Sequence, residues 1–210
     1  ETATPPVALP LEPATPPVAL PLEPASQAYH LNSFGRPFMR PPYLGKCSTD
    51  SVTVAWQTDI PSSSLVKYGT TPLLGSERSD ANTDIEHVIT LEGLESGTSY
   101  YYQAFSKGQP LAPIATFRTA KGPDQPKLAF AVLGDSGQGS LPQFAIAAGV
   151  HAAQPDFVLH TGDVIYPQGQ TWNWDPFYFV PYRQILASTC LYTARGNHDE
   201  LDPYRAAMVL

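Results

Sequence analysis

The sequence has few cysteines and no long apolar run. Its two cysteines, Cys47 and Cys190, allow a single disulfide at most. They lie in different parts of the chain, so the sequence alone does not decide whether that bridge forms. No apolar stretch reaches the length of about 20 residues that a membrane-spanning helix needs. The sequence therefore predicts no membrane span.

Charged residues are also scarce, especially basic ones. They make up 15% of the chain, whereas about a quarter is usual for a soluble protein. The 12 lysines and arginines face 19 aspartates and glutamates, which gives a net charge of −7. Binding of nucleic acid through a basic surface is therefore not expected. We interpret the acidic excess as a contribution to solubility.

Proline, in contrast, is abundant and concentrated at the start of the chain. Residues 1–36 are rich in proline, and the segments 3–13 and 14–24 have the same sequence. Each proline removes a backbone donor and disfavours helix in the residue before it. This first region is predicted to be a disordered or polyproline II spacer that holds the following domains away from a membrane or wall. A proline-rich docking ligand is less favoured, because no basic residue flanks the repeats.

The next region, 37–120, has the pattern of a β-sandwich. Apolar and polar residues alternate around Trp56, which predicts a strand with one buried face. Further strands are expected at 65–68, 87–91, 99–105 and 114–119, with turns at 61–64 and 95–97. The segment that leads to Tyr100 is typical of the tyrosine corner of sandwich domains.

The last region, 121–210, reads as β-α-β-α-β. Three apolar runs predict buried strands at 128–133, 157–159 and 190–194, and a helix with Ser140 as its N-cap follows the first strand. Each run is followed at once by a polar motif: Gly134-Asp135-Ser136-Gly137, Gly162-Asp163-Val164-Ile165-Tyr166 and Gly196-Asn197-His198-Asp199-Glu200. In an open α/β sheet, the carboxyl ends of the strands form the edge where ligands and metals bind.

The side chains of these motifs suit a metal centre. Asp135, Asp163, Tyr166 and Asn197 all offer oxygen, which is the ligand atom that hard cations prefer. His198 stands beside them as a candidate proton donor. Two metal ions held close together can activate a water and stabilise both oxygens of an in-line phosphoryl displacement.

In these motifs the chain resembles the purple acid phosphatase branch of the calcineurin-like metallophosphoesterases. That family reads Asp-x-Gly, then Gly-Asp-x-x-Tyr, then Gly-Asn-His-(Asp/Glu), and the three motifs match in this order. The resemblance implies a fold of class β + α/β. A fibronectin type III-like sandwich would be followed by the first half of an αββα metallophosphoesterase sandwich.

The resemblance also implies roles for the motif residues. Asp163 would bridge the two metals, Asp135 and Tyr166 would bind the first, and Asn197 would bind the second. A Tyr166 phenolate favours ferric iron, so the cofactors would be two metal ions, Fe with Zn, Mn or Fe. His198 would stabilise the phosphate or protonate the leaving alkoxide of a small-molecule phosphate monoester.

Two further expectations concern the surroundings of the site. We expect Asp199 to orient the His198 imidazole. The loop 167–176 could wall the substrate pocket with Trp172 or Trp174 at its rim, although these tryptophans could equally pack a helix onto the sheet.

The family site takes three histidines from later motifs, and none follows the third motif here. His30, His87, His151 and His160 all precede it. We therefore expect the chain to be a fragment that carries about half of the ligands. Half of the αββα sandwich alone would expose a sheet edge and an apolar face. The sandwich module and the proline-rich region favour a secreted or extracytoplasmic protein.

Other interpretations remain open. Asp135 could be a simple turn residue, and Tyr166 could pack beneath a loop. The Gly-Asp-Ser-Gly segment also resembles the nucleophile regions of chymotrypsin-like proteases and of small lipase-type esterases, which would make Ser136 a nucleophile. A third alternative is a non-catalytic exported surface module with a vestigial half-site.

Overall fold

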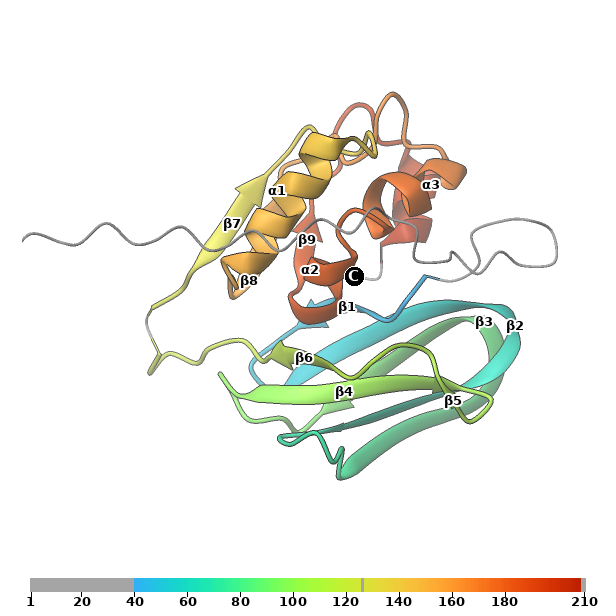
Figure 1. Cartoon of the computed structure of the whole chain (residues 1–210), viewed down its shortest axis with the longest axis vertical. Coiled ribbons are helices and arrows are strands. Elements are labelled where there is room, and N and C mark those ends of the chain that lie inside the picture. Colours follow the sequence, from blue (N-terminus) through green and yellow to red (C-terminus); the bar gives the residue numbers. More distant parts are fainter. Residues whose placement is uncertain (1–39, 126, 209–210) are drawn as a thin grey trace, which may run out of the picture.

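The computed structural model describes residues 40–125 and 127–208, which form a β-domain and an α/β segment packed against it (Figure 1). This is the expected fold class, a β-sandwich followed by a metallophosphoesterase-like part. The proline-rich region 1–36 lies outside the described residues, and the prediction made for it stays a prediction.

The β-domain is an antiparallel assembly built around two long strands. Within residues 40–125 the strands are β1 (Tyr43–Cys47), β2 (Ser51–Gly69), β3 (Ser76–Glu92), β4 (Ser99–Ser106), β5 (Gln109–Pro110) and β6 (Ala115–Arg118). Strand β2 pairs with β1 near its start, with β4 near its end and with β3 along most of its length. Strands β5 and β6 pair with β4. Both long strands therefore contribute to the β1 end and to the β4 end of the domain.

The predicted turn at 61–64 was wrong. The backbone stays extended through this segment, and the pairing between β2 and β3 shifts register between Gln57 and Ser64. Such irregular pairing tolerates Pro61, which has no N–H to donate. The two strands predicted around Trp56 and at 65–68 are thus two halves of β2, which curves together with β3 at one end of the domain (Figure 1).

The core of the β-domain contains the apolar residues expected of the strand around Trp56. Val52, Val54 and Trp56 are at most 2% exposed. Tyr100 Oη accepts a hydrogen bond from the backbone N–H of Glu95 at 2.9 Å, which confirms the tyrosine corner. The prediction that this strand has a single buried face was wrong. Thr53 and Ala55 are buried too, because the opposite face of β2 packs against the α/β segment.

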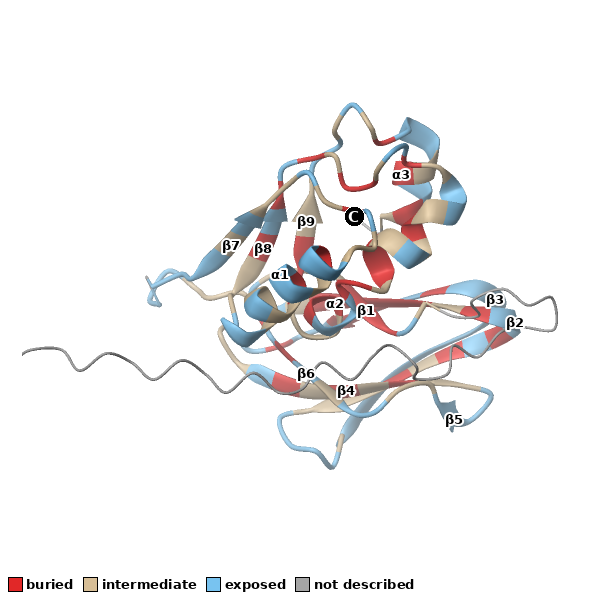
Figure 2. Cartoon of the chain, turned by 45° about the horizontal axis from the view of Figure 1, so that its top comes forward, coloured by how far each residue is buried: buried red, intermediate tan, exposed pale blue. Residues whose placement is uncertain are grey.

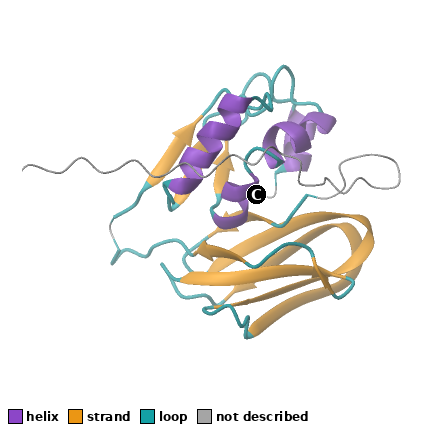
Figure 3. Cartoon of the chain, viewed as in Figure 1, coloured by secondary structure: helices purple, strands orange, loops and turns teal. Residues whose placement is uncertain are grey.

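The α/β segment contains a parallel sheet in the order β7-β8-β9. Its elements are β7 (Phe130–Leu133), α1 (Leu141–Ala152), β8 (Phe157–His160), the 3₁₀ turn η1 (Thr171–Asn173), the π-helix η2 (Asp175–Phe179), α2 (Arg183–Ser188), β9 (Leu191–Thr193) and α3 (Leu201–Ala207). The three predicted strands and the predicted helix are present, but the prediction that the first strand is buried was wrong, because β7 has no buried residue. Ser140 occupies the N-cap of α1, but its side chain makes no capping hydrogen bond. All helices of the described residues lie in this segment (Figure 3).

The two parts of the chain share a polar and aromatic interface. Arg40 Nε donates to Asp175 Oδ1 at 2.6 Å, and its guanidinium stacks 4.3 Å from the centre of the Phe179 ring. Tyr102 Oη donates to the carbonyl of Ala187 in α2 at 2.8 Å. These contacts hold α2 and η2 against the β-domain.

The sheet of the α/β segment has one open apolar face. Leu128, Phe130 and Val132 are 55–56% exposed, and β7 is mostly uncovered in Figure 2. The rings of Phe130 and Phe157 stack at 5.2 Å between β7 and β8. An exposed apolar face of this kind is what the sequence predicted for half of an αββα sandwich. Of the helices in the described residues, none is both long enough and apolar enough to span a membrane.

Candidate metal centre

The three motifs meet because the three strands that precede them end in register. Leu133 of β7 lies opposite His160 of β8, and His160 lies opposite Thr193 of β9. The loops that follow β7 and β8 remain hydrogen-bonded to each other, because Ser136 N–H donates to the carbonyl of Asp163 at 3.1 Å. His198 N–H in turn donates to Asp163 Oδ1 at 2.9 Å. The first and third motifs thus both contact the second.

Glycines permit this close approach. Gly137 has a φ of +74°, and a Cβ at this position would overlap the carbonyl oxygen of Val164. A Cβ on Gly196 would overlap the carboxylate and the backbone nitrogen of Asp163. Only a residue without a side chain allows the motifs to touch at these two points.

The two candidate aspartates have an uncommon backbone conformation. Asp135 has a φ of +52° and Asp163 a φ of +51°, both in the left-handed region that most side chains avoid. Aspartate tolerates this region better than most residues, but the conformation still requires support from its surroundings. The surrounding hydrogen bonds supply that support and fix the direction of both side chains.

Tyr166 joins the two carboxylates. Its Oη lies 2.9 Å from Asp135 Oδ1 and 3.0 Å from Asp163 Oδ2. Partial desolvation and these two carboxylates raise the pKa of the phenol, so its proton is retained. The pKa of the Asp163 carboxyl is lowered, mainly by the hydrogen bond from the His198 backbone N–H. The structure therefore brings three of the four predicted ligands into direct contact.

Asn197 and His198 border this cluster. The backbone N–H of Asn197 interacts with the Asp163 carboxylate, while its side chain is exposed. The His198 ring packs against Tyr166 with 4.4 Å between ring centres. Its Nδ1 lies 2.7 Å from the carbonyl of Pro167, so Nδ1 carries a proton and Nε2 is the atom that can exchange one with a substrate.

The expectation for Asp199 was wrong. Its carboxylate does not contact the His198 ring; it accepts three backbone N–H groups, from Val164 at 3.1 Å, Ile165 at 3.0 Å and Gly196 at 2.8 Å. Asp199 is fully buried. It fastens the second motif to the third, a role for which the neighbouring sequence gave no signal.

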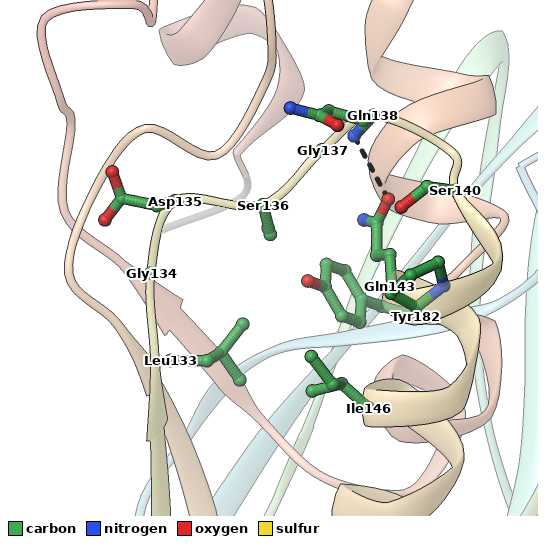
Figure 4. A pocket seen from close by; sticks show the side chains of 11 residues that line it. Leu133, Gly134, Asp135, Ser136, Gly137, Gln138, Ser140, Gln143, Ile146 and Tyr182 are labelled. Atoms are coloured by element: carbon green, nitrogen blue, oxygen red, sulfur yellow. Dashed lines mark hydrogen bonds between the residues drawn. The ribbon is translucent and has the colours of Figure 1, made fainter.

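Ser136 and the loop tryptophans were considered in other roles. Ser136 Oγ lies 2.8 Å from His160 Nε2 and borders a pocket of about 170 Å³ between β7 and α1. Asp135 also borders that pocket, but Figure 4 shows its carboxylate pointing away from it. Trp174 is 1% exposed and packs in the core, whereas Trp172 is 70% exposed.

The residues present suit a hard cation. The phenol oxygen of Tyr166 lies within hydrogen-bond distance of two carboxylates, and oxygen is the ligand atom that such ions prefer. Without a cation, the two carboxylates share the hydrogen-bonding proton of the Tyr166 phenol. A bound cation would replace that proton. Within residues 40–125 and 127–208, no group of three or more His, Cys, Asp or Glu side chains forms a metal cluster.

Comparisons with known proteins identify the families that the two parts of the chain resemble. Residues 42–119 match the family model for the purple acid phosphatase N-terminal domain, and residues 128–209 match that for calcineurin-like phosphoesterases. No curated protein matches the sequence at a significant level.

Two solved structures share the fold of most of the chain. A purple acid phosphatase from yellow lupin (Lupinus luteus) seeds has a TM-score of 0.60 and 20% identity over 77% of this chain. PhoD has a TM-score of 0.58 and 14% identity over 76% of this chain. The chain spans only 35% and 38% of the lengths of these two proteins.

Proposed function

The chain combines the N-terminal domain of purple acid phosphatases with a calcineurin-like phosphoesterase domain, and from this premise we propose that it hydrolyses phosphate monoesters through a two-metal centre. The family supports metal-dependent phosphoester hydrolysis in general. The acid phosphatase reaction, the pair of metals and the assignment of each residue are the proposal.

One observation carries the proposal: Tyr166 Oη lies between the carboxylates of Asp135 and Asp163. Two carboxylates that share one phenolic proton leave net negative charge at the carboxyl edge of the sheet. A cation relieves that charge, and it would replace the phenolic proton when it binds. Packing alone does not explain why two aspartates with a left-handed backbone conformation place their carboxylates beside the same phenol.

The proposed ligands divide between two ions. Asp163 would contact both, Asp135 and Tyr166 would hold one, and the Asn197 amide oxygen would hold the other. A phenolate ligand favours iron at the first position, with Zn, Mn or Fe at the second. Such a pair, when bound, supplies an activated water and stabilises charge on the phosphoryl oxygens.

The chain's own residues would manage the leaving group. His198 is held through its Nδ1 by the carbonyl of Pro167, which leaves Nε2 to donate a proton to the leaving alkoxide. The substrate would be a small phosphate ester. The proposed location is secreted or extracytoplasmic.

Metal titration of the purified 210-residue chain tests the first part of the proposal. After treatment with a chelator, Zn²⁺, Mn²⁺ or Fe³⁺ is added and the melting temperature is followed. Saturation at about 100 times the dissociation constant adds about 2.7 kcal/mol of stability, which corresponds to about 5–10 °C. Asp163→Asn should remove this increase, while Asp124→Asn, at an exposed position, should keep it.

Iron offers a second readout. A ferric–phenolate pair absorbs visible light, so Fe³⁺ should colour the protein, and Tyr166→Phe should abolish the colour. Tyr101→Phe is the matched control, because Tyr101 lies on β4 in the β-domain, far along the chain from the motifs. The absence of metal stabilisation and of colour would favour the alternative, a non-catalytic module with a vestigial half-site.

A further inference from the structure

The two cysteines of the chain meet at the interface between its two parts. Cys47 ends β1 of the β-domain, and Cys190 immediately precedes β9 of the α/β segment. Cys190 is 3% exposed and is packed within the core cluster of the β-domain. Cys47 is partly buried against the same cluster. Residues separated by more than 140 positions in sequence thus share one small region of the interface.

Tyr192 holds the Cys47 backbone in this place. Its Oη accepts the Cys47 N–H at 3.3 Å and donates to the Cys47 carbonyl at 3.2 Å. Cys190 and Tyr192 are two positions apart in extended chain, so their side chains leave it on the same side. Tyr192, which holds Cys47, therefore lies next to Cys190, and both side chains face the β-domain.

The two thiols differ in reactivity. A hydrogen bond between them lowers the pKa of Cys47, and this bond together with burial raises the pKa of Cys190. Cys47 Sγ also lies 3.6 Å from the carbonyl oxygens of Ser48 and Arg118. Cys47 is the more exposed and more acidic thiol, which makes it the attacking group. Cys190 is the buried partner that would complete the exchange.

We propose that Cys47 and Cys190 form a reversible disulfide that ties β1 of the β-domain to the start of β9. Both thiols are free in the structure. The oxidant is a low-molecular-weight disulfide such as oxidised glutathione. Since β9 leads directly into the third motif, the bridge would fasten the base of the candidate metal centre to the β-domain.

The exchange balances in two steps. The Cys47 thiolate attacks one sulfur of oxidised glutathione, forms a mixed disulfide and releases one glutathione thiolate. The Cys190 thiol then loses its proton and attacks the Cys47 sulfur of that mixed disulfide. The protein disulfide forms, and a second glutathione leaves. Two protein thiols are oxidised and one glutathione disulfide is reduced to two thiols.

Intact mass measures this reaction directly, because the chain has no other cysteine. The reduced 210-residue chain is equilibrated with graded ratios of oxidised to reduced glutathione, quenched with acid and alkylated. The expected product is a monomer that has lost two hydrogen atoms and takes no alkyl group. A digest without reductant should contain Cys47 and Cys190 in one linked pair of peptides.

Single variants test the order of the steps. Cys190→Ala should stop at one glutathione on Cys47, and Cys47→Ala should remain unmodified because Cys190 is buried. Oxidation of the unsubstituted chain should raise its melting temperature by roughly 5 °C or more, since the bridge closes a long loop. Cys47→Ala should show no such increase under the same treatment.

Three results would overturn the proposal. They are full alkylation of both cysteines at every glutathione ratio, a stable glutathione adduct on the unsubstituted chain without the bridge, and a disulfide-linked dimer. A melting temperature that falls when the bridge forms would overturn the claim that the bridge fastens the two parts together.

Discussion

His160 donates its Nε2 proton to the Oγ of Ser136 across 2.8 Å. The direction follows from the other ring nitrogen, since Nδ1 accepts the backbone N–H of Gly162 at 3.3 Å and so carries no proton. A serine nucleophile needs the opposite polarity, with a histidine nitrogen that accepts the hydroxyl proton. The pair therefore supports the first motif structurally, and the esterase interpretation of Ser136 loses its base.

Ser136→Ala should leave phosphate ester hydrolysis of the metal-loaded protein within about twofold, because Ser136 borders the pocket whereas the Asp135 carboxylate points away from it. The lost hydrogen bond should lower the free energy of unfolding by about 1 kcal/mol. Steady-state hydrolysis of a chromogenic phosphate monoester and urea unfolding measure the two effects. Abolished hydrolysis of a chromogenic carboxyl ester by this variant would restore the esterase interpretation.

Stability of the metal-free chain should fall as the pH is lowered from about 6.5 to about 4. Burial lowers the pKa of His160 to about 4, although the carboxylates of Asp199, Asp135 and Asp163 oppose this shift. A histidine in the unfolded chain titrates near 6.5. Between these two pH values the unfolded state binds a proton that the folded state does not. Neutral His160 therefore makes its full contribution to the free energy of unfolding above pH 6.5, and about 3 kcal/mol of it is lost by pH 4.

Urea unfolding at pH 7.0 and pH 4.5, with a chelator present, measures this slope. His160→Asn should reduce the slope without removing it, because burial also lowers the pKa of His87. An unchanged slope in His160→Asn would contradict the assignment to His160.

Asp199→Ala should be among the most destabilising substitutions in the α/β segment. It leaves three backbone N–H groups without their carboxylate, two of them in the second motif and one at Gly196. Each lost partner costs on the order of 1 kcal/mol or more, so we expect a loss of about 3 kcal/mol in urea unfolding. Asp202→Ala, at an exposed position of α3, is the matched control. Equal effects of the two variants would show that Asp199 does not fasten the motifs.

Gly196→Ala should weaken metal binding at least about tenfold, because the new Cβ would displace the Asp163 carboxylate. Calorimetric titration with Zn²⁺ measures the change. Gly149→Ala provides the comparison: no atom lies within 4 Å of the added carbon, and alanine favours the helix, so stability should rise by up to about 1 kcal/mol. Unchanged affinity in Gly196→Ala would show that the third motif can move away without loss.

Local patterns in the sequence predicted the elements that their own residues specify. The strands before the three motifs, the strand around Trp56 and the tyrosine corner at Tyr100 are confirmed, whereas the burial predicted for the first strand and the single buried face predicted around Trp56 are not. The sequence also predicted that Asp135, Asp163 and Tyr166 lie at one edge of the sheet. In the structure, Tyr166 contacts both carboxylates there.

The errors arose where distant residues decide the conformation. Pro61 and the serines after it favour a turn locally, but pairing with β3 keeps the backbone extended. The first half of β3 is polar on both faces, so no alternation marked it as a strand. Asp199 follows His198 in sequence, yet the two side chains leave the loop toward different partners, and adjacency alone does not give that direction.

The continuous course of β2 affects how the β-domain opens. Strand β2 is hydrogen-bonded to β1 at one end of the domain and to β4 at the other. Because one strand runs through both ends, neither end should unfold independently of the other. Amide protons on β1 and β4 should therefore exchange with solvent deuterium at similar rates, set by one cooperative unfolding event. The β-domain would then behave as a single thermodynamic unit that supports the candidate metal centre.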